Sequence, residues 1–495
     1  MSPARRDDLL VVAAALAPLA LFLLRERQIA GAVGFPLDDS WIHLHFARNL
    51  AEGAGFAYNP GRPVAGSTAP LWTLLLAAGA AVLGPSLALA KALGVAAALG
   101  AALLTRRAAA AFGAPAPLAL LAAVGLLWTG PMAWGALSGM EVTLAALLVA
   151  AALLAHARDR LVWSAAWAAL AALARPEAVL LVPCLALARP LGARRLAAFG
   201  ALTAAALLPM VLFSLWTAGA PYPATAAAKV EGGLLGWLGG LREPLAVTLL
   251  ARPWRFLAEW VGWLARTHGV LPLALVPGLV LAWGRGGRAL GAVGLVLLVH
   301  PLGMALLAPY RGPAFQEGRY SIHLLPLAFV ILAVVAGASR WARAGRWLPA
   351  LAVAAYLGAA AVALAPAATR YGWAVQNINA MQVHLGRWLD AHVTPRARLA
   401  VNDIGAIAYF SRREVLDLMG LVTPEVIPYR RRGEGGVVEY LLETCPDHVV
   451  IFPAWFPGLA ARADLLEPVY RVRLARNEVA GAAEMVVYRL RRCAV

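Results

Sequence analysis

The sequence carries little charge for its length. Of its 495 residues 14% are charged and 61% are hydrophobic, and the mean hydropathy is +0.71. A soluble domain of this size does not have so apolar a composition. Runs long enough to cross about 30 Å of hydrocarbon recur along the chain. They begin near Leu9, Thr68, Ser86, Pro117, Val142, Val162, Ala178, Leu196, Val270, Leu290, Ile322 and Leu348. We therefore expect a polytopic α-helical membrane protein with about 11 to 13 transmembrane helices.

Cysteine and acidic residues are scarce as well. The three cysteines, Cys184, Cys445 and Cys493, have no CxxC spacing and form no disulfide framework that the sequence supports. The 26 acidic residues stand against 43 basic ones, a net charge of +17. Arginines gather in short loops such as 189–195 and 340–346, which suits anionic lipid headgroups. Nucleic-acid binding would need a basic, aromatic-bearing soluble surface, and the sequence offers none.

The first apolar run has the basic flank of a signal peptide. Residues 9–24 follow the arginines at 5–6, but no small-residue cleavage site comes after them. We expect this run to remain as the first helix, with its N-terminus in the cytoplasm. The positive-inside rule also places Arg158, Arg160 and Arg194 in the cytoplasm, whereas the arginines at 106–107 do not fit that pattern.

The hydropathy pattern changes near residue 368. Beyond it lie short apolar runs bounded by turn residues, which indicate strands. Examples are RLAVNDIGAIAYF, EVLDLMG, HVVIFPAWF and EMVVYRLRR. Runs of this length cannot span a bilayer. We therefore expect a transmembrane domain at 1–367 and a small soluble α/β domain at 368–495.

Two adjacent aspartates, Asp38 and Asp39, follow the first apolar run. Ionisable residues at a membrane are costly, so their presence suggests function. The helix predicted to follow has apolar Ile42, Phe46 and Leu50 on one face and polar His45, Arg48, Asn49 and Glu52 on the other. We expect the polar face, with His45, to line an aqueous substrate cavity. One aspartate would cap this helix while the other faces the substrate; alternatively, both serve only as caps.

A carboxylate pair where a membrane segment emerges can meet both a lipid-linked donor and a water-borne acceptor. In glycosyl transfer from a phosphate-activated sugar the leaving phosphate is already a good anion, so only the acceptor hydroxyl needs a base. A hydrolase that cleaves an ether would need two carboxyl groups. The sequence therefore favours a membrane-embedded glycosyltransferase in which one carboxylate of the pair serves as the general base.

Three further side chains are candidates for substrate binding. Tyr58 and Asn59 stand in a Gly- and Pro-rich loop, GFAYNPGRPVAGST, that lines a sugar site or is simply the start of the next helix. Glu141 follows LSGM at the start of a predicted helix. Its carboxylate either favours the helix dipole or faces the cavity.

Cations are needed where a phosphate leaves. Arg175 and Glu177 interrupt a long apolar stretch around a proline, either as a structural ion pair or as part of the active cavity. The loop PYPATAAAKV ends at Lys229, and PYRGPAFQEGRYSIHLLP contains Arg319. We expect Lys229, Arg319 and Arg175 to bind the donor phosphate, with positive-inside topology as the alternative reading. His300, in an apolar run, is expected to be a hydrogen-bonded core residue.

The order of these motifs resembles that of the GT-C superfamily of glycosyltransferases. Within it, the chain is similar to the arabinofuranosyltransferases that finish cell-wall arabinan and to their uncharacterised bacterial relatives. The similarity spans nearly the whole chain. The motifs are, in order, DDSWIHLHFARNLAEGAGFAYNPG, GSTAPLWTLLLA, LSGMEVTLAALL, LARPEAVLL, PYPATAAAKV, GRYSIHLLPL and NDIGAIAYFSRREVLDLMGL.

The resemblance implies an inverting transferase of the bacterial inner membrane that uses a polyprenyl-phosphate-linked sugar. Asp38 would match the catalytic base in the first extracytoplasmic loop, and Asp39 would support it or a divalent cation; no other cofactor is implied. Lys229 and Arg319 would match cations near the donor phosphate. The acceptor is a glycan, a lipid or a protein, and the soluble domain lies on the extracytoplasmic side.

The chain departs from the family pattern at two motifs. Ala224 and the alanines at 226–227 replace the asparagine and aromatic usual near Lys229, and Ser-Trp replaces Ala-Tyr after the second aspartate. The resemblance therefore does not identify the donor sugar. An alternative is a transporter or flippase of lipid-linked saccharides, but the sequence has no half-repeat of the kind transporters use.

Overall fold

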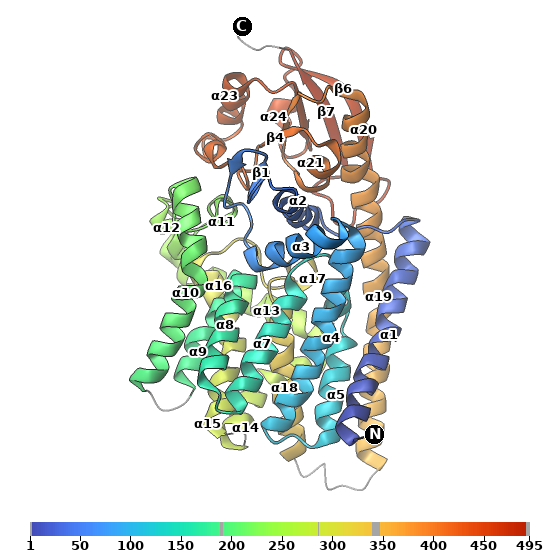
Figure 1. Ribbon diagram of the computed structural model, residues 1–495, viewed down its shortest axis with the longest axis vertical. Helices are drawn as coiled ribbons and strands as arrows, with labels where there is room; N and C mark the ends of the chain where they lie inside the picture. Colours follow the sequence, from blue (N-terminus) through green and yellow to red (C-terminus); the bar gives the residue numbers. More distant parts are fainter. Residues whose placement is uncertain (1, 189–191, 286, 339–346, 492–495) are drawn as a thin grey trace. The chain divides into compact units, whose positions relative to one another are not determined.

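A computed structural model describes residues 2–188, 192–285, 287–338 and 347–491 (Figure 1). Cys493 and the basic loop at 340–346 lie outside the described residues. Contacts divide the chain into two compact units. Unit 1 comprises Met1–Leu24, Lys91–Pro209 and Val230–Ala368, and unit 2 comprises Arg25–Ala90, Met210–Lys229 and Thr369–Val495. The predicted boundary after residue 367 stays a prediction, because unit 2 adds two earlier segments to the tail.

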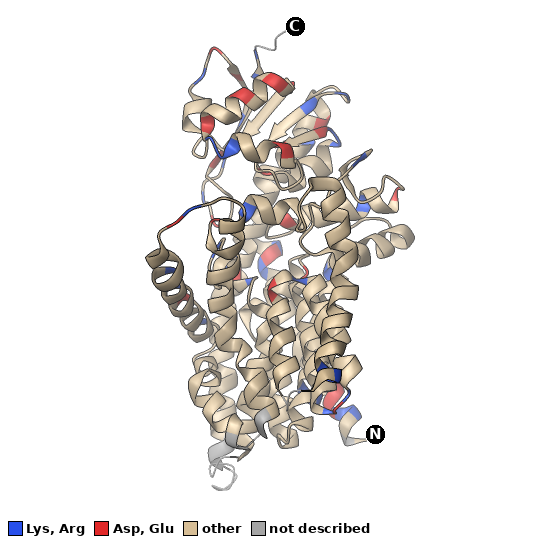
Figure 2. Cartoon of the chain, turned by 90° about the vertical axis from the view of Figure 1, so that its left-hand side faces the viewer, with Lys and Arg blue, Asp and Glu red and all other residues tan. Residues whose placement is uncertain are grey.

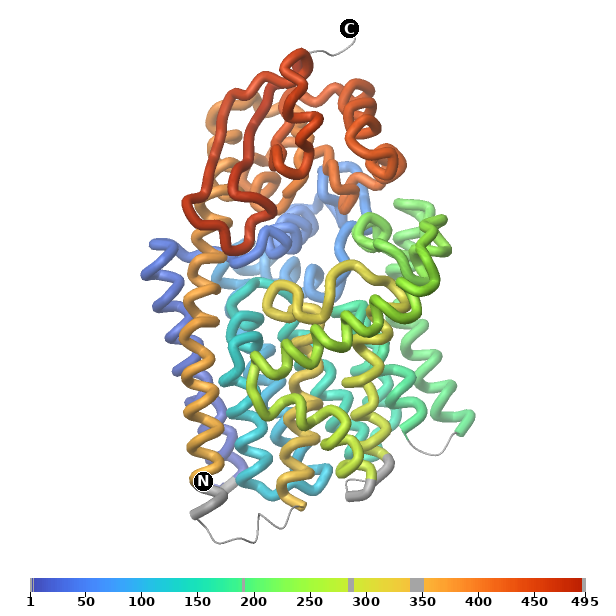
Figure 3. Tube along the Cα trace, turned by 180° about the vertical axis from the view of Figure 1, so that it is seen from behind, coloured from blue at the N-terminus to red at the C-terminus, as the bar shows by residue number. Residues whose placement is uncertain are grey.

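Unit 1 is a bundle of apolar helices, of which α1 and α19 continue into unit 2 and α10 ends there. Its helices are α1 (Pro3–Ala30), α4 (Leu87–Ala111), α5 (Ala116–Leu127), α6 (Gly130–Leu137), α7 (Val142–Ala157), α8 (Leu161–Ala174), α9 (Leu181–Leu187), α10 (Ala193–Ala218), α12 (Gly233–Leu238), α13 (Arg252–Thr267), α14 (Val276–Arg285), α15 (Gly287–Gly294), α16 (Val296–Leu307), α17 (Phe315–Gly318), α18 (Leu325–Ala338) and α19 (Trp347–Ile378). Helix α7 packs against α8, and α18 packs against α5. The segment from α13 to α15 is distant in Figure 1 and lies in front in Figure 3.

Six helices in the described part of the chain are long and apolar enough to cross a membrane, or seven if the bent pair α5–α6 is one span. Five shorter apolar helices account for other predicted runs. The 11 to 13 transmembrane helices expected from the sequence therefore outnumber the helices that are long enough to cross a membrane by themselves. The bend between α5 and α6 is 59°. At this break the Thr129 side chain accepts a hydrogen bond from the backbone N of Met132 and so caps α6. Polytopic membrane character is confirmed, and most of the length of these helices is tan, without charge, in Figure 2.

The arginines at 106–107, which did not fit the positive-inside pattern, pair with acidic residues of α1. Arg106 contacts Asp8 at 2.6 Å and Asp7 at 3.6 Å, and Arg107 contacts Asp8 at 3.0 Å. The end of α4 therefore lies beside the start of α1. The two arginines share the end of unit 1 that carries the chain's N-terminus, the end expected in the cytoplasm.

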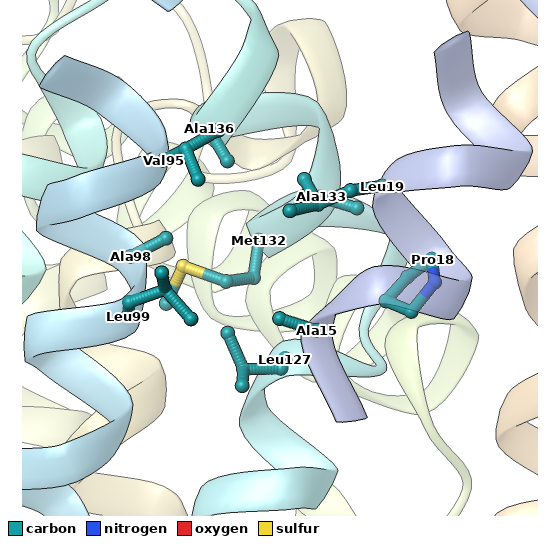
Figure 4. A pocket seen from close by; sticks show the side chains of 10 residues that line it. All are labelled: Ala15, Pro18, Leu19, Val95, Ala98, Leu99, Leu127, Met132, Ala133 and Ala136. Atoms are coloured by element: carbon teal, nitrogen blue, oxygen red, sulfur yellow. The ribbon is translucent and has the colours of Figure 1, made fainter. Parts of the chain in front are cut away.

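A small pocket opens between α1, α4, α5 and α6 (Figure 4). Its walls are apolar side chains, among them Pro18, Leu99, Leu127 and Met132. A sugar or a phosphate needs polar partners. This pocket is therefore not a candidate site for either group.

Unit 2 contains the predicted α/β domain. Its elements are α2 (Asp39–Ala51), β1 (Ala57–Asn59), β2 (Arg62–Pro63), α3 (Pro70–Leu83), α11 (Ala224–Lys229), η6 (Asn379–Val383), α20 (His384–His392), β3 (Arg398–Val401), α21 (Gly405–Ser411), β4 (Glu414–Asp417), α22 (Ile427–Arg430), α23 (Glu434–Thr444), β5 (His448–Ile451), α24 (Pro457–Ala460), β6 (Leu466–Arg473) and β7 (Glu484–Leu490). The described strands β3–β7 form one sheet in the order β4-β3-β5-β7-β6. Strand β3 is parallel to β4 and β5, whereas β7 is antiparallel to β5 and β6.

The alternation of side chains along the strands builds a core on each face of this sheet. On β3, Leu399 and Val401 join the core with α20 and α21, while Ala400 joins the core with α23 and α24. The four runs singled out in the sequence supply β3 with α21, β4, β5 and β7. The expected fold class, a helical membrane protein with a small α/β domain, is confirmed.

Candidate functional site

The Asp38 carboxylate binds the start of a helix far along the chain. Its two oxygens accept hydrogen bonds from the backbone N of Gly405 (2.5 Å) and of Ala406 (2.7 Å), the first residues of α21. Asp38 makes no side-chain cap for α2, so the alternative in which both aspartates cap that helix is wrong. The residue is only 6% exposed. Burial raises the pKa of Asp38 above its ordinary value, against the two backbone hydrogen bonds, which lower it.

Gly405 permits this close approach. A Cβ built on Gly405 would lie 2.1 Å from the carbonyl oxygen of Asp38. No side chain fits there without moving the backbone of residue 38.

We therefore expect Gly405→Ala to lower the thermal stability of the purified protein by about 1–3 kcal/mol. Gly435→Ala in α23 is the matched control, because nothing lies within 4 Å of the added methyl group. Thermal unfolding in one detergent compares the two. Equal midpoints would mean that the contact between Gly405 and Asp38 is dispensable.

Asp39 is the more accessible of the two aspartates. It begins α2, and its side chain is 29% exposed. Its carboxylate lies 3.6 Å from the Nζ atom of Lys229, the last residue of α11. The aspartate pair and the cation predicted for the donor phosphate thus meet in one place.

Helix α11 is held in place by hydrogen bonds to backbone carbonyl groups. The backbone N of Ala224 donates to the carbonyl of Ala65 at 2.9 Å, and the Thr225 hydroxyl donates to the carbonyl of Leu421 at 3.0 Å. Arg430 donates to the carbonyl of Ala228 at 3.2 Å. These hydrogen bonds fix the short helix from which the Lys229 side chain extends.

Most of the polar face of α2 is buried, because His45, Arg48 and Asn49 are at most 5% exposed, whereas Glu52 is exposed. The assignment of His45 to substrate binding stays a prediction. Nε2 of His45 donates to the carbonyl of Tyr58 at 2.8 Å, and Arg48 donates to the carbonyl of Tyr409 at 2.7 Å. Asn49 donates to the carbonyls of Ala57 and Tyr58. Burial lowers the pKa of His45 to about 3 and keeps its ring neutral. These side chains satisfy backbone groups of the neighbouring loops, so the contacts give His45 a structural role.

Tyr58 and Asn59 tie the loop after α2 to the sheet. The Tyr58 hydroxyl donates to the carbonyl of Ile404 at 2.9 Å. Asn59 donates to the carbonyl of Val415 at 2.8 Å and accepts from its backbone N at 2.9 Å. Their assignment to substrate binding stays a prediction, and the contacts that they make are structural.

Sequence reasoning missed Asp403. Its carboxyl group is hydrogen-bonded to Asp38, and Nε2 of Gln382 donates to its Oδ2 atom at 2.6 Å. Burial, followed by the neighbouring charge of Asp38, raises the pKa of Asp403 well above its ordinary value. The available signal was an aspartate directly after a short strand, in the motif NDIGAIAYF.

The remaining candidates lie in unit 1. Arg175 forms a buried ion pair with Glu141 and a second with Glu177 at 3.2 Å. Helix α8 ends at Ala174, directly before Arg175, and Pro176 begins the 3₁₀ turn η1 (Pro176–Leu180). Because Glu141 and Glu177 neutralise the charge of Arg175, these contacts favour a structural ion pair over a place in the active cavity.

Arg319 also lies in unit 1, beside Arg175. Both guanidinium groups lie over the ring of Tyr320, at 4.8 Å for Arg175 and 5.0 Å for Arg319. Arg319 donates to the Tyr320 hydroxyl at 3.0 Å. His300 is buried and donates to the Ser321 hydroxyl at 3.1 Å, so its expected place in the core is confirmed.

The predicted residues therefore form two groups. Unit 2 brings together Asp38, Asp39, Lys229 and Asp403. It also contains His45, Tyr58 and Asn59, whose side chains bind backbone groups of neighbouring segments. Unit 1 brings together Glu141, Arg175, Glu177 and Arg319. Among the described residues no group of three or more His, Cys, Asp or Glu side chains is placed to hold a metal ion.

Comparisons with known proteins address the fold. A family profile matches residues 375–488, a domain of unknown function (DUF8728). No curated protein matches the chain by sequence. ArnT from Cupriavidus metallidurans, in the apo state, matches with a TM-score of 0.64 and 14% identity over 98% of both chains. The archaeal oligosaccharyltransferase AglB from Archaeoglobus fulgidus matches with a TM-score of 0.57 and 12% identity, over 89% of this chain and 68% of that chain.

The chain has the GT-C fold. The resemblance seen in the sequence motifs is thereby confirmed at the level of the fold. The arabinofuranosyltransferase AftD from Mycobacteria also matches, over 99% of this chain and 41% of that chain, with 17% identity and a TM-score of 0.45. The GT-C fold rests on ArnT and AglB, whose TM-scores are 0.64 and 0.57.

Proposed function

We propose that the protein is an integral-membrane glycosyltransferase that moves a sugar from a polyprenyl-phosphate donor to a glycan, lipid or protein acceptor. The observation that carries the proposal is the match to ArnT over 98% of both chains. One structure of that protein contains undecaprenyl phosphate, and one of AglB contains a dolichol phosphate and an inhibitory peptide. From the resemblance of the sequence motifs we further propose that the site faces the extracytoplasmic side of a bacterial inner membrane.

The contacts favour Asp39 over Asp38 as the general base. A base needs a carboxylate oxygen that the acceptor hydroxyl can reach. Both oxygens of Asp38 already accept backbone hydrogen bonds in a buried position, whereas the Asp39 side chain is 29% exposed. The role first assigned to Asp38 therefore passes to its neighbour, and Asp38 holds α2 in position.

In the proposed reaction the acceptor oxygen attacks the anomeric carbon, and its proton passes to Asp39. The bond from that carbon to the phosphate oxygen breaks, and the electron pair leaves with the lipid phosphate. A single displacement of this kind inverts the anomeric centre. Lys229 is proposed to offset the charge that grows on the phosphate. The assignment of Arg319, in unit 1, to a donor phosphate stays a separate prediction.

The proposal is tested by identifying, by mass spectrometry, the lipid-linked sugar that co-purifies with the protein. Transfer from that lipid to an acceptor is then measured in liposomes. Movement of the intact lipid between leaflets without transfer of its sugar would overturn the proposal in favour of a flippase.

Lys229→Ala should weaken donor binding by about 1.5–3 kcal/mol, the scale of a hydrogen bond to a charged group. Lys229→Arg keeps the charge and serves as the control. Titration of the polyprenyl-phosphate lipid measures donor affinity, and a separate titration measures acceptor affinity. A loss confined to acceptor affinity would contradict the assignment of Lys229 to the phosphate.

A further inference from the structure

Asp403 lies at the carboxyl end of the central parallel strand. It follows β3, which pairs with β4 on one side and β5 on the other. Asn402 fixes the loop on β5, because its backbone N donates to the carbonyl of Val450 and its Oδ1 atom accepts from the backbone N of Phe452, both at 3.3 Å. The carboxyl edge of parallel strands is where α/β sheets usually carry functional side chains.

The neighbours of Asp403 favour a proton on its carboxyl group. Two carboxyl groups can share a hydrogen bond only when one of them carries a proton, since an ionised carboxylate only accepts. Asp403 and Asp38 share such a bond. The amides of Gly405 and Ala406 already donate to Asp38 and favour its ionised form. The raised pKa of Asp403 agrees with a proton that stays on this residue.

Gln382 orients Asp403 from the other side. Its amide donates to the Asp403 Oδ2 atom at 2.6 Å, and Gln382 itself is fully buried on η6. Asp403 is half-buried. The carboxyl group is thus held between a fixed donor, Gln382, and a fixed acceptor, Asp38.

Asp38 and Asp39 are consecutive residues, so whatever fixes Asp38 also fixes the start of α2. We infer that Asp403, contributed by the segment of unknown function, is a positioning residue of the transfer site: as a neutral acid it donates to Asp38 and thereby orients Asp39. This inference rests on the proposed function. With one proton retained, the three carboxyl groups of Asp38, Asp39 and Asp403 carry two negative charges, and Lys229 offsets one of them.

The charged and titratable groups around the pair come from three further places. Asp39 at the start of α2 repels both members, and it is paired with Lys229 of α11. Tyr58 of β1 faces both acids, and burial raises its pKa, so it stays neutral. Loss of the shared proton would leave Asp38 and Asp403 ionised side by side, next to the charge of Asp39.

The test compares Asp403→Asn with Asp403→Ala. The asparagine amide donates a hydrogen bond to Asp38 without a titratable proton, so Asp403→Asn should keep transfer near the wild-type level. The alanine variant loses the donor and should lower turnover about 100-fold, the scale of a displaced reacting group. Asp464→Ala, at a surface pair with Arg462, is the control and should match the wild type. Full turnover in Asp403→Ala, or equal losses in both variants, would overturn the inference.

A second readout does not depend on transfer. The infrared difference spectrum between the wild type and Asp403→Asn, at neutral pH, should contain the carbonyl band of a protonated carboxylic acid. If this band is missing, the inference that Asp403 and Asp38 share a proton is wrong. If the band is present but the wild type transfers no sugar from any lipid donor, the proposed function fails while the proton on Asp403 stands.

The same proton predicts a pH dependence of stability. A carboxyl group whose pKa is raised on folding contributes stability that is present at low pH and lost as pH rises through its folded value. The wild type should therefore lose thermal stability relative to Asp403→Asn as pH increases above the ordinary aspartate range. Parallel melting curves at all pH values would contradict a proton held by this pair.

Discussion

Replacing Asp39 with asparagine should abolish sugar transfer while the protein stays folded and binds its donor lipid. The amide keeps the shape of the side chain but cannot take the acceptor proton, and a general base contributes about 10²–10⁴-fold. Turnover with the purified lipid donor measures the loss, and donor titration confirms an intact site. Turnover near the wild-type level would remove Asp39 as the base.

Asp38→Asn is the matched comparison at the neighbouring position. An asparagine offers one acceptor oxygen to the two backbone N–H groups of Gly405 and Ala406, so one of them loses its partner. We expect a loss of about 1–3 kcal/mol in stability, the cost of a buried unsatisfied group. If Asp38→Asn melts like the wild type but transfers no sugar, the base is Asp38 after all.

Glu141→Ala should destabilise unit 1 by about 3–5 kcal/mol, because it leaves the Arg175 charge without its buried partner. Both side chains of this pair are 4% exposed. Thermal unfolding in detergent measures the effect, and the double variant Glu141→Leu with Arg175→Met should recover much of it, since it removes both charges together.

Glu177→Ala is the control for this ion pair. Glu177 contacts the same arginine at 3.2 Å, but its side chain is 21% exposed, so its loss should cost less. A Glu141→Ala variant that melts normally but no longer binds the donor would instead place the pair in the active cavity.

Sequence patterns predicted the parts of this protein that depend on local chemistry. Apolar runs predicted helices, and short apolar runs bounded by turn residues predicted β3, β4, β5 and β7 of the C-terminal sheet but not β6. The rare acidic pair marked the candidate site at Asp38 and Asp39. Helical periodicity also sorted His45 and Arg48 onto one polar face. It could not tell that this face meets backbone carbonyls instead of water, because periodicity says which residues share a face and not what covers it.

The contacts between the candidate site residues could not be predicted from the sequence for a different reason. Asp403 has no local signal stronger than its place after a short strand, and its meeting with Asp38 depends on how distant segments pack. The same holds for Arg175 and Glu141: the sequence marks Arg175 and Glu177 as an interruption of an apolar stretch and leaves Glu141 between the helix dipole and the cavity, but it does not pair Arg175 with Glu141. A charged residue next to an apolar segment is energetically costly, but the sequence does not show which residue of opposite charge offsets that cost.

The bond between Asp38 and the backbone of Gly405 joins residues 367 positions apart. During synthesis Asp38 emerges long before the helix that it caps, so its carboxylate lacks these backbone donors until most of the chain has been made. Contacts this distant in sequence form late. We therefore expect a chain halted before residue 405 to lack the two donors that hold Asp38, so that the proposed transfer site stays incomplete in it.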